Sequence, residues 1–132
     1  LARTLSGLGE TLEKSDQKDQ ARASYQEARQ LLEQAAQKEK DNDEAAEGLA
    51  EVLVKSARFS REGGEVGTAV KDADKAVELL RKLVARPEGR SDYRRQLAMA
   101  LTLKGELARS QKKAELAREC FEEAVGMWNS YG

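Results

Sequence analysis

The chain has 132 residues and a nearly balanced charge, with 23 basic and 24 acidic side chains and a net charge of -1. No basic block marks an electrostatic footprint for nucleic acid, so we expect no nucleic-acid partner. Histidine is absent and cysteine occurs once, which removes the usual zinc and copper ligand sets and histidine-based acid-base catalysis. We therefore expect no enzymatic activity, no metal site and no cofactor.

The sequence also indicates where the protein is located and whether this segment contacts a membrane. No apolar run approaches the roughly 18 residues needed to span a bilayer, and no signal peptide is visible, so we expect no membrane contact by this segment. The single cysteine, Cys120, excludes an internal disulfide and favours a reducing compartment, which predicts a cytoplasmic location. Because Leu1 opens in the middle of a pattern without methionine, we expect a fragment of a longer protein.

Apolar and small residues recur at spacings of three and four, the helical period, and interruptions divide the chain into six predicted helices. Ser15 or Asp16 can cap the second, and the acidic stretch 41–44 supplies caps and first-turn residues for the third. Gly63-Gly64 forms the clearest internal turn, and the segment 86–90, with the only proline, ends the fourth. The predicted helices run from 1 to about 14, from the cap at 15 or 16 to about 40, from the stretch 41–44 to about 61, from about 65 to 85, from the cap at 91 or 92 to about 110, and from about 111 to 129.

The six predicted helices form three similar pairs because one pattern recurs every 48 residues. A fixed period of this length marks a repeat array, in which each unit stacks on its neighbours. We expect one repeat domain, with units at about 1–40, 41–88 and 89–132. The recurring residues include Leu5, Leu53 and Leu101; Ala21, Ala69 and Ala117; Ala28, Ala76 and Ala124; and Leu32, Leu80 and Trp128.

Inside a unit, a small residue on the first helix precedes alanines and an aromatic ring on the second. Gly9 precedes Tyr25 in the first unit, and Gly105 precedes Phe121 in the third. This pattern resembles the tetratricopeptide repeat, although the period exceeds that family's usual length of about 34 residues. The middle unit has Ala73 in place of the ring, so we expect it to pack more thinly.

The resemblance implies an all-α fold: three tetratricopeptide-like helix-turn-helix hairpins, six helices in all, stacked as a short right-handed superhelix. The segment Tyr93–Leu101 also looks like the long-period repeats of large bacterial regulatory proteins, where repeats often follow a serine/threonine kinase domain. That second likeness predicts a bacterial signalling protein.

In the family, the first helix of each pair lines a concave groove. The resemblance therefore implies a protein-interaction module that docks a peptide or partner helix through arginine-carboxylate pairs and shallow apolar contact. Ser6 and Glu10 stand where members that bind chaperone tails carry a lysine and an asparagine, so we do not expect that ligand. Alternatively, the groove charges form only a solvated helix face. The implied groove positions are Arg3, Ser6, Glu10, Glu13, Val54, Arg58, Arg61, Met99, Thr102, Glu106 and Arg109.

A second function stays open: a structural spacer or self-association segment that stacks end to end through its terminal helices. Trp128 either covers the end of the stack or joins Met127 and Tyr131 in an apolar terminus that drives homodimerisation. We predict that Cys120, beside Phe121, is a half-buried thiol and not a nucleophile, because no histidine is present to activate it.

Overall fold

Three helical hairpins make up the computed structural model, which describes residues 2–14, 18–38, 43–85 and 91–131. The all-α prediction is confirmed, and the described ranges contain no strand. The predicted unit boundaries near 40 and 88, and the caps predicted at 15–16 and 41–42, lie outside the described residues. The helices are α1 (Ala2–Lys14), α2 (Lys18–Lys38), α3 (Asp43–Glu62), α4 (Val66–Val84), α5 (Ser91–Ser110) and α6 (Ala114–Tyr131).

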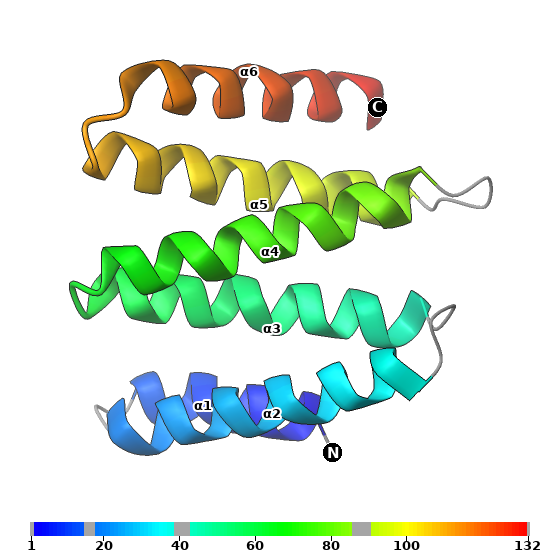
Figure 1. Ribbon diagram of the computed structural model, residues 1–132, viewed down its shortest axis with the longest axis vertical. Coiled ribbons are helices and arrows are strands. Elements are labelled where there is room, and N and C mark those ends of the chain that lie inside the picture. The colour runs from blue at the N-terminus through cyan, green and yellow to red at the C-terminus, as the bar shows by residue number, and fades with distance from the viewer. Residues whose placement is uncertain (1, 15–17, 39–42, 86–90, 132) are drawn as a thin grey trace.

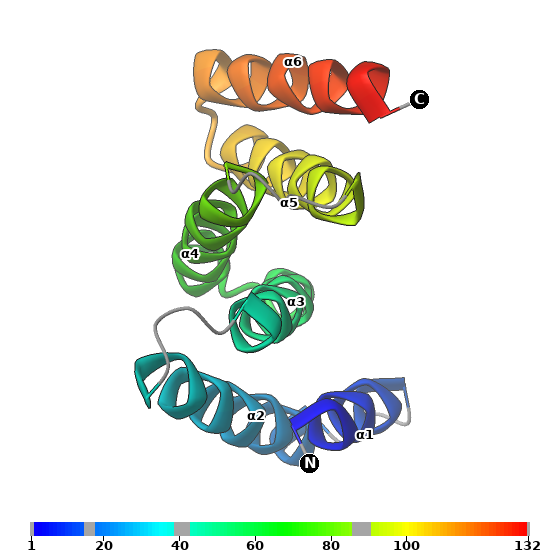
Figure 2. The ribbon, with the colours of Figure 1, turned by 90° about the vertical axis from the view of Figure 1, so that its right-hand side faces the viewer.

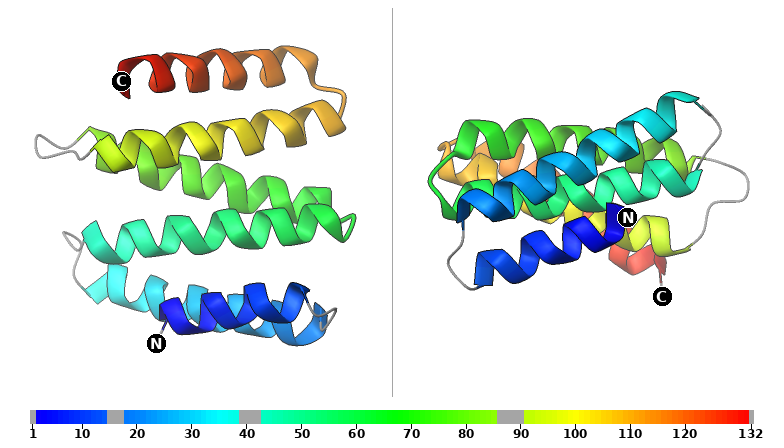
Figure 3. Two further views of the ribbon diagram at one scale, coloured as in Figure 1. Left: turned by 180° about the vertical axis from the view of Figure 1, so that it is seen from behind. Right: turned by 90° about the horizontal axis from the view of Figure 1, so that it is seen from below.

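The hairpins stack in chain order along the long axis of the molecule (Figure 1). The first helices of the hairpins, α1, α3 and α5, lie on one side of the stack, and α2 and α4 lie on the other (Figure 2). Seen from behind, α1, α3 and α5 form the near layer (Figure 3). Helix α6 packs on α5 at one end, whereas α1 and α2 form the opposite end.

The core lies between successive helices of the stack. Its main cluster draws members from α3, α4, α5 and α6, including Leu53, Leu80 and Leu101, each at most 1% exposed. A smaller cluster of Ala21, Tyr25 and Phe59 joins α2 to α3, with the two ring centroids 5.8 Å apart. Apolar burial between neighbouring helices therefore holds the array together, as expected for a repeat fold.

The recurring glycine on the first helix lets the paired helices approach closely in the first and third hairpins. A Cβ at Gly9 would lie 3.0 Å from Tyr25 Cε1, and one at Gly105 would lie 2.7 Å from Phe121 Cε1. Each ring therefore occupies the space that a side chain on the first helix would need. Ala57 takes the equivalent place in the middle hairpin and is fully buried.

The middle hairpin is not thinly packed, contrary to the sequence-based expectation. Ala73, which stands where the ring was expected, is fully buried in a cluster with Leu103 and Leu107 of α5. Leu103 of α5 lies one period after Lys55 of α3. The helix that follows the middle hairpin therefore carries a large apolar side chain at a position where the helix that follows the first hairpin carries a lysine. The leucine of the following helix thus fills the volume that the missing ring leaves.

Two hairpin turns use the same backbone motif one period apart. In the turn after α3, the Glu65 amide donates to the Ser60 carbonyl at 2.8 Å, and Gly64 has φ 84°. After α5, the Lys113 amide donates to the Ala108 carbonyl at 2.9 Å, and Lys112 has φ 62°. Both are Schellman motifs with a left-handed residue. Because this turn uses three residues after Ser110, α6 begins at Ala114 and not near Gln111 as predicted.

Candidate functional site

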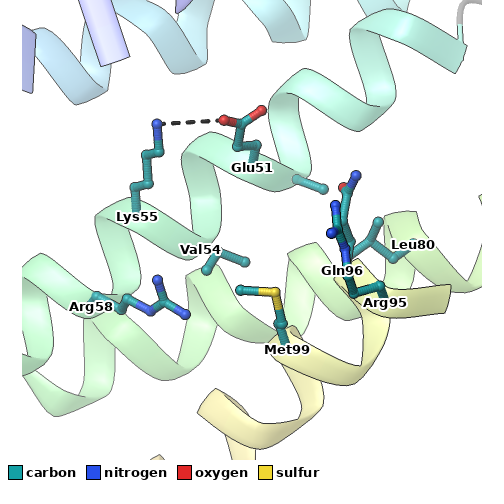
Figure 4. A pocket seen from close by; sticks show the side chains of 9 residues that line it. Glu51, Val54, Lys55, Arg58, Leu80, Arg95, Gln96 and Met99 are labelled. Carbon is teal, nitrogen blue, oxygen red and sulfur yellow. Dashed lines mark ion pairs between the residues drawn. The ribbon is translucent and has the colours of Figure 1, made fainter. Parts of the chain in front are cut away.

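A hollow of about 340 Å³ opens on the face formed by α3 and α5 (Figure 4). On α3, Ala50, Val54 and Arg58 follow one another at spacings of four, as do Glu51 and Lys55, so these lining residues share one side of that helix. The same holds for the α5 residues, and Leu80 of α4 lies between the two helices. The lining consists of Ala50, Glu51, Val54, Lys55, Arg58, Leu80, Arg95, Gln96 and Met99.

The hollow combines an apolar base with cationic edges. Val54 and Met99 lie across from one another in Figure 4, and Met99 keeps 40% of its surface exposed. Arg58 extends from α3 beside Val54, and Arg95 comes from α5 on the far side. This arrangement can receive an apolar group flanked by an anionic one.

The cations of the hollow differ in how they are paired. Lys55 Nζ lies 3.3 Å from Glu10 Oε2 and 3.5 Å from Glu51 Oε1, so its charge is compensated. For the Arg58 guanidinium, the described part of the chain provides no ion-pair or hydrogen-bond partner. Arg58 is also exposed, so its five N–H groups remain available to a ligand carboxylate.

The structure brings three of the predicted groove residues, Val54, Arg58 and Met99, into this hollow. Further along the same helices, Arg61 of α3 forms an ion pair with Glu106 of α5. That pair ties the two helices together and leaves neither charge open.

The remaining predicted positions face neighbours within the chain. Glu10 is held by Lys55. Thr102 Oγ1 donates to the Ala98 carbonyl at 2.9 Å, one turn back in α5. The Arg109 guanidinium lies 5.7 Å from the Phe121 ring centroid, so it leans toward α6.

One predicted groove position is wrong. Ser6 is only 3% exposed, so it lies inside the packing of α1 and cannot meet a ligand. Because a serine side chain is small, its neighbours can cover it completely. The helical period alone does not tell such a buried serine from an exposed one. Arg3 and Glu13 lie in α1, but their side chains are outside the described part of the structure.

Six of the lining residues were not predicted from the sequence: Ala50, Glu51, Lys55, Leu80, Arg95 and Gln96. Lys55 follows Val54 and stands four residues after Glu51, a spacing that places it on the same side of α3. Gln96 Nε2 donates to Glu47 Oε1 at 3.1 Å, which ties α5 to α3 at the edge of the hollow. Leu80 lies on α4, the second helix of its hairpin, so the rule that first helices line the groove does not predict it.

Cys120 is buried more completely than predicted, with 5% of its surface exposed. Burial raises the pKa of the Cys120 thiol, which keeps the sulfur in its protonated, unreactive form. Within the described ranges, no three His, Cys, Asp or Glu residues are grouped so that they could hold a metal ion. None of the helices described is both long and apolar enough to cross a membrane.

Comparison with known families agrees with the hairpin architecture. Two family models, each described as a tetratricopeptide repeat, match residues 21–61 and 98–127. The first match runs from α2 into α3, across the junction between two hairpins, and the second covers most of α5 and α6. Together they match more than half of the chain. No curated protein matches it.

Proposed function

The chain belongs to the tetratricopeptide repeat family, whose repeats generally mediate protein-protein interaction or scaffolding, and we propose that its binding site is the hollow between α3 and α5. The ligand of this proposal is a peptide or partner helix that presents a carboxylate beside an apolar side chain. Family members are typically non-enzymatic, and the proposal assigns no catalytic role.

The proposal rests on the position and the pairing of Arg58. This residue is an exposed arginine at the edge of an apolar hollow, and no carboxylate of the described chain pairs with it. A hydrogen bond to a charged group contributes about 1.5–3 kcal/mol, so one carboxylate here would weigh heavily in a small interface. Val54 and the half-exposed Met99 offer the apolar contact, and methionine adapts to different side-chain shapes.

The proposed setting is a cytoplasmic bacterial signalling protein. Its support is the likeness of Tyr93–Leu101 to the long-period repeats of large bacterial regulatory proteins, which often carry a serine/threonine kinase domain. In that setting the repeats would recruit a protein to the regulatory assembly.

The proposal predicts that charge reversal at Arg58 weakens binding without unfolding the protein. A display library of short peptides, selected on the wild-type chain, should yield sequences with Asp or Glu next to an apolar residue. In fluorescence polarisation, Arg58→Glu should weaken the selected peptides by about tenfold or more, the value of one charge-assisted hydrogen bond.

Lys71→Glu serves as the matched control, because it makes the same change in charge at an exposed position of α4 outside the hollow. The control should bind as the wild type does, and both variants should keep the wild-type melting temperature, since exposed substitutions change stability by less than about 0.5 kcal/mol. Equal weakening by both variants would show a general charge effect. Unchanged binding by Arg58→Glu would show that the hollow is not the binding site.

A further inference from the structure

A second cleft, with a volume of about 270 Å³, lies on the side of the stack where α2 and α4 run (Figure 2). Residues of α2 line one wall, and Glu65 and residues of α4 line the other. The α3 residues Ser56, Phe59 and Ser60 form the floor, and Phe59 and Ser60 are each 6% exposed. The cleft and the hollow between α3 and α5 have no lining residue in common, so they are separate sites.

Two ion pairs close the ends of this cleft. Arg22 Nη2 lies 3.1 Å from Glu65 Oε1, and Arg29 Nη1 lies 3.0 Å from Asp72 Oδ1. The two arginines are seven positions apart in the sequence, as are the two carboxylates, so the pairs are separated by about 10 Å along the helices. The cleft has no other charged lining residue, so its two positive and two negative charges cancel.

Midway between the two ion pairs, no direct contact bridges the cleft. Gln26 of α2 and Thr68 of α4 stand there, and both are exposed. Within the described residues, neither the Gln26 carboxamide nor the Thr68 hydroxyl has a hydrogen-bond partner. A carboxamide carries two N–H donors and an acceptor, and a hydroxyl carries one donor and also accepts. The centre of the cleft therefore offers hydrogen bonds in both directions at no net charge.

The junction between the second and third hairpins lacks this polar lining, although the same helix pattern recurs there. Most of the equivalent positions one period later are apolar. Polar groups at a helix junction cost stability relative to apolar packing, so sequences keep them mainly where they serve a function. The positions that follow Arg22, Arg29 and Thr68 by one period hold Val70, Val77 and Leu116.

The equivalent of Gln26 at that second junction is already paired. Asp74 follows Gln26 by one period, and Lys104 follows Ser56. The Lys104 ammonium lies 3.1 Å from Asp74 Oδ1, so the polar side chain at the centre has its partner inside the chain. At the first junction the same position has no partner in the described structure and borders a cleft.

We propose that this cleft binds the side-chain carboxamide of an asparagine or glutamine on a partner protein. A carboxamide is neutral, and it can donate to and accept from the Gln26 carboxamide while it reaches the Thr68 hydroxyl. The balanced lining gives a charged side chain no net attraction. Because ion pairs close both ends, a side chain that enters from solvent fits the cleft, whereas a main chain running along it would have to break a pair. The proposal does not depend on the hollow, which has its own lining.

Titrations of the ¹⁵N-labelled protein, followed by NMR, test this proposal with three blocked amino acids. N-acetylglutamine N-methylamide should shift the side-chain signals of Gln26 and the amide signal of Thr68, with a Kd of about millimolar, as expected for so small a ligand. N-acetylglutamate N-methylamide has nearly the same shape but is charged, and N-acetylalanine N-methylamide offers only main-chain amides. Both should bind about tenfold more weakly or less, because each loses two or more hydrogen bonds.

Gln26→Leu and Thr68→Val remove the hydrogen-bonding groups with little change in size. They should weaken the glutamine probe by about fivefold or more, whereas Gln34→Leu, at an exposed position of α2 outside the cleft, should bind as the wild type does. Circular dichroism should show unchanged helix content, since all three substituted side chains are exposed. Arg58→Glu should also bind the probe normally, which separates this test from that of the hollow.

Three results would overturn the proposal. The first is the absence of shifts at Gln26 and Thr68 up to the solubility limit of the glutamine probe. The second is equal binding of the glutamine and alanine probes, which would show that the cleft recognises main-chain amides. The third is binding of the glutamine probe that survives unchanged in Gln26→Leu, which would place it elsewhere on the protein.

Discussion

The two helices of the end hairpins meet where a side chain is missing. Gly9 faces Tyr25 and Gly105 faces Phe121, and in both cases the ring occupies the position of an added Cβ. The sequence predicts this contact because a glycine costs about 1 kcal/mol in a helix relative to alanine, so a glycine at a recurring position indicates close packing. The same reasoning fails for Ser6, because nothing in a serine distinguishes a buried position from a groove position.

At this scale we predict opposite effects for two identical substitutions. In Gly105→Ala the new Cβ would lie 2.7 Å from Phe121 Cε1, so the ring must shift. Overpacking costs about 1–3 kcal/mol, which should exceed the gain of about 1 kcal/mol in helix propensity. Gly126→Ala meets nothing within 4 Å and should instead gain about 0.5–1 kcal/mol. Urea denaturation measures both, and equal gains would show that Phe121 has room to move.

Between elements, a run of polar contacts joins the second helices of the first two hairpins. Arg29 Nη1 of α2 lies 3.0 Å from Asp72 Oδ1 of α4, a carboxylate that is 4% exposed. Ser56 of α3 donates to the other oxygen of Asp72 at 3.1 Å. Glu33 Oε1 accepts from Arg29 Nε at 3.0 Å and from Lys75 Nζ at 3.2 Å. The Ser56 hydroxyl therefore supports a buried carboxylate.

The network predicts a pH-dependent difference between the wild type and Glu33→Gln. Burial alone would raise the pKa of Glu33, but the hydrogen bonds from Arg29 and Lys75 lower it below its ordinary value of 4.5. A carboxyl with a lowered folded-state pKa stabilises the fold above its unfolded value, and this contribution is lost as pH falls through the folded value. Glu33→Gln should therefore be less stable at pH 7, by at most about 1 kcal/mol because the partners are partly exposed.

Thermal melts at pH 7 and at successively lower pH check this prediction. The difference between wild type and Glu33→Gln should shrink as Glu33 becomes protonated. Glu122→Gln is the control, because Glu122 pairs with Arg118 on the surface, with side-chain exposures of 65% and 78%. It should melt like the wild type throughout. A difference for Glu33→Gln that persists unchanged at acid pH would contradict the assigned role of its charge.

Helix positions were well predicted from the sequence, and helix ends less well. The apolar period fixes which segments are helical, because each must bury one side. The start of α6 was missed because the turn before it uses Lys112 in a left-handed conformation, where glycine is the usual signal. The close packing of the middle hairpin was not predicted, for a different reason. Leu103 belongs to the next unit, and a motif defined within one unit does not include residues of its neighbour.

For the whole molecule, the period predicts the stack, but the site only in part. Val54, Arg58 and Met99 follow from the rule that first helices line the groove. Whether a charged side chain is already paired does not follow from that rule, because the ion pairs of Lys55 with Glu10 and of Arg61 with Glu106 join residues from different units. Arg58 stands out from the other charged residues, and so becomes the proposed contact for a ligand, only once these pairs are known.

The arrangement of the core predicts that the first hairpin opens separately from the rest. The buried members of the main cluster come from α3 through α6, and α2 adds only the partly buried Leu32 to it, whereas the described residues of the buried cluster that links α2 to α3 are just Ala21, Tyr25 and Phe59. Contacts in a repeat protein run between neighbours, so a weak junction can open without unfolding the others. Phe59→Ala should therefore speed amide hydrogen exchange in α1 and α2, and leave the amides of α4, α5 and α6 as protected as in the wild type.

Leu107→Ala is the matched variant for this test. Leu107 follows Phe59 by one period and is fully buried at the junction of α4 and α5, in the middle of the stack. Truncating a buried leucine typically costs about 2–5 kcal/mol, so this variant should speed exchange on both sides of the junction, from α3 to α6. Hydrogen-exchange mass spectrometry resolves the helices separately. If Phe59→Ala speeds exchange equally in all six helices, the stack opens as one cooperative unit, and the small cluster is not a weak junction.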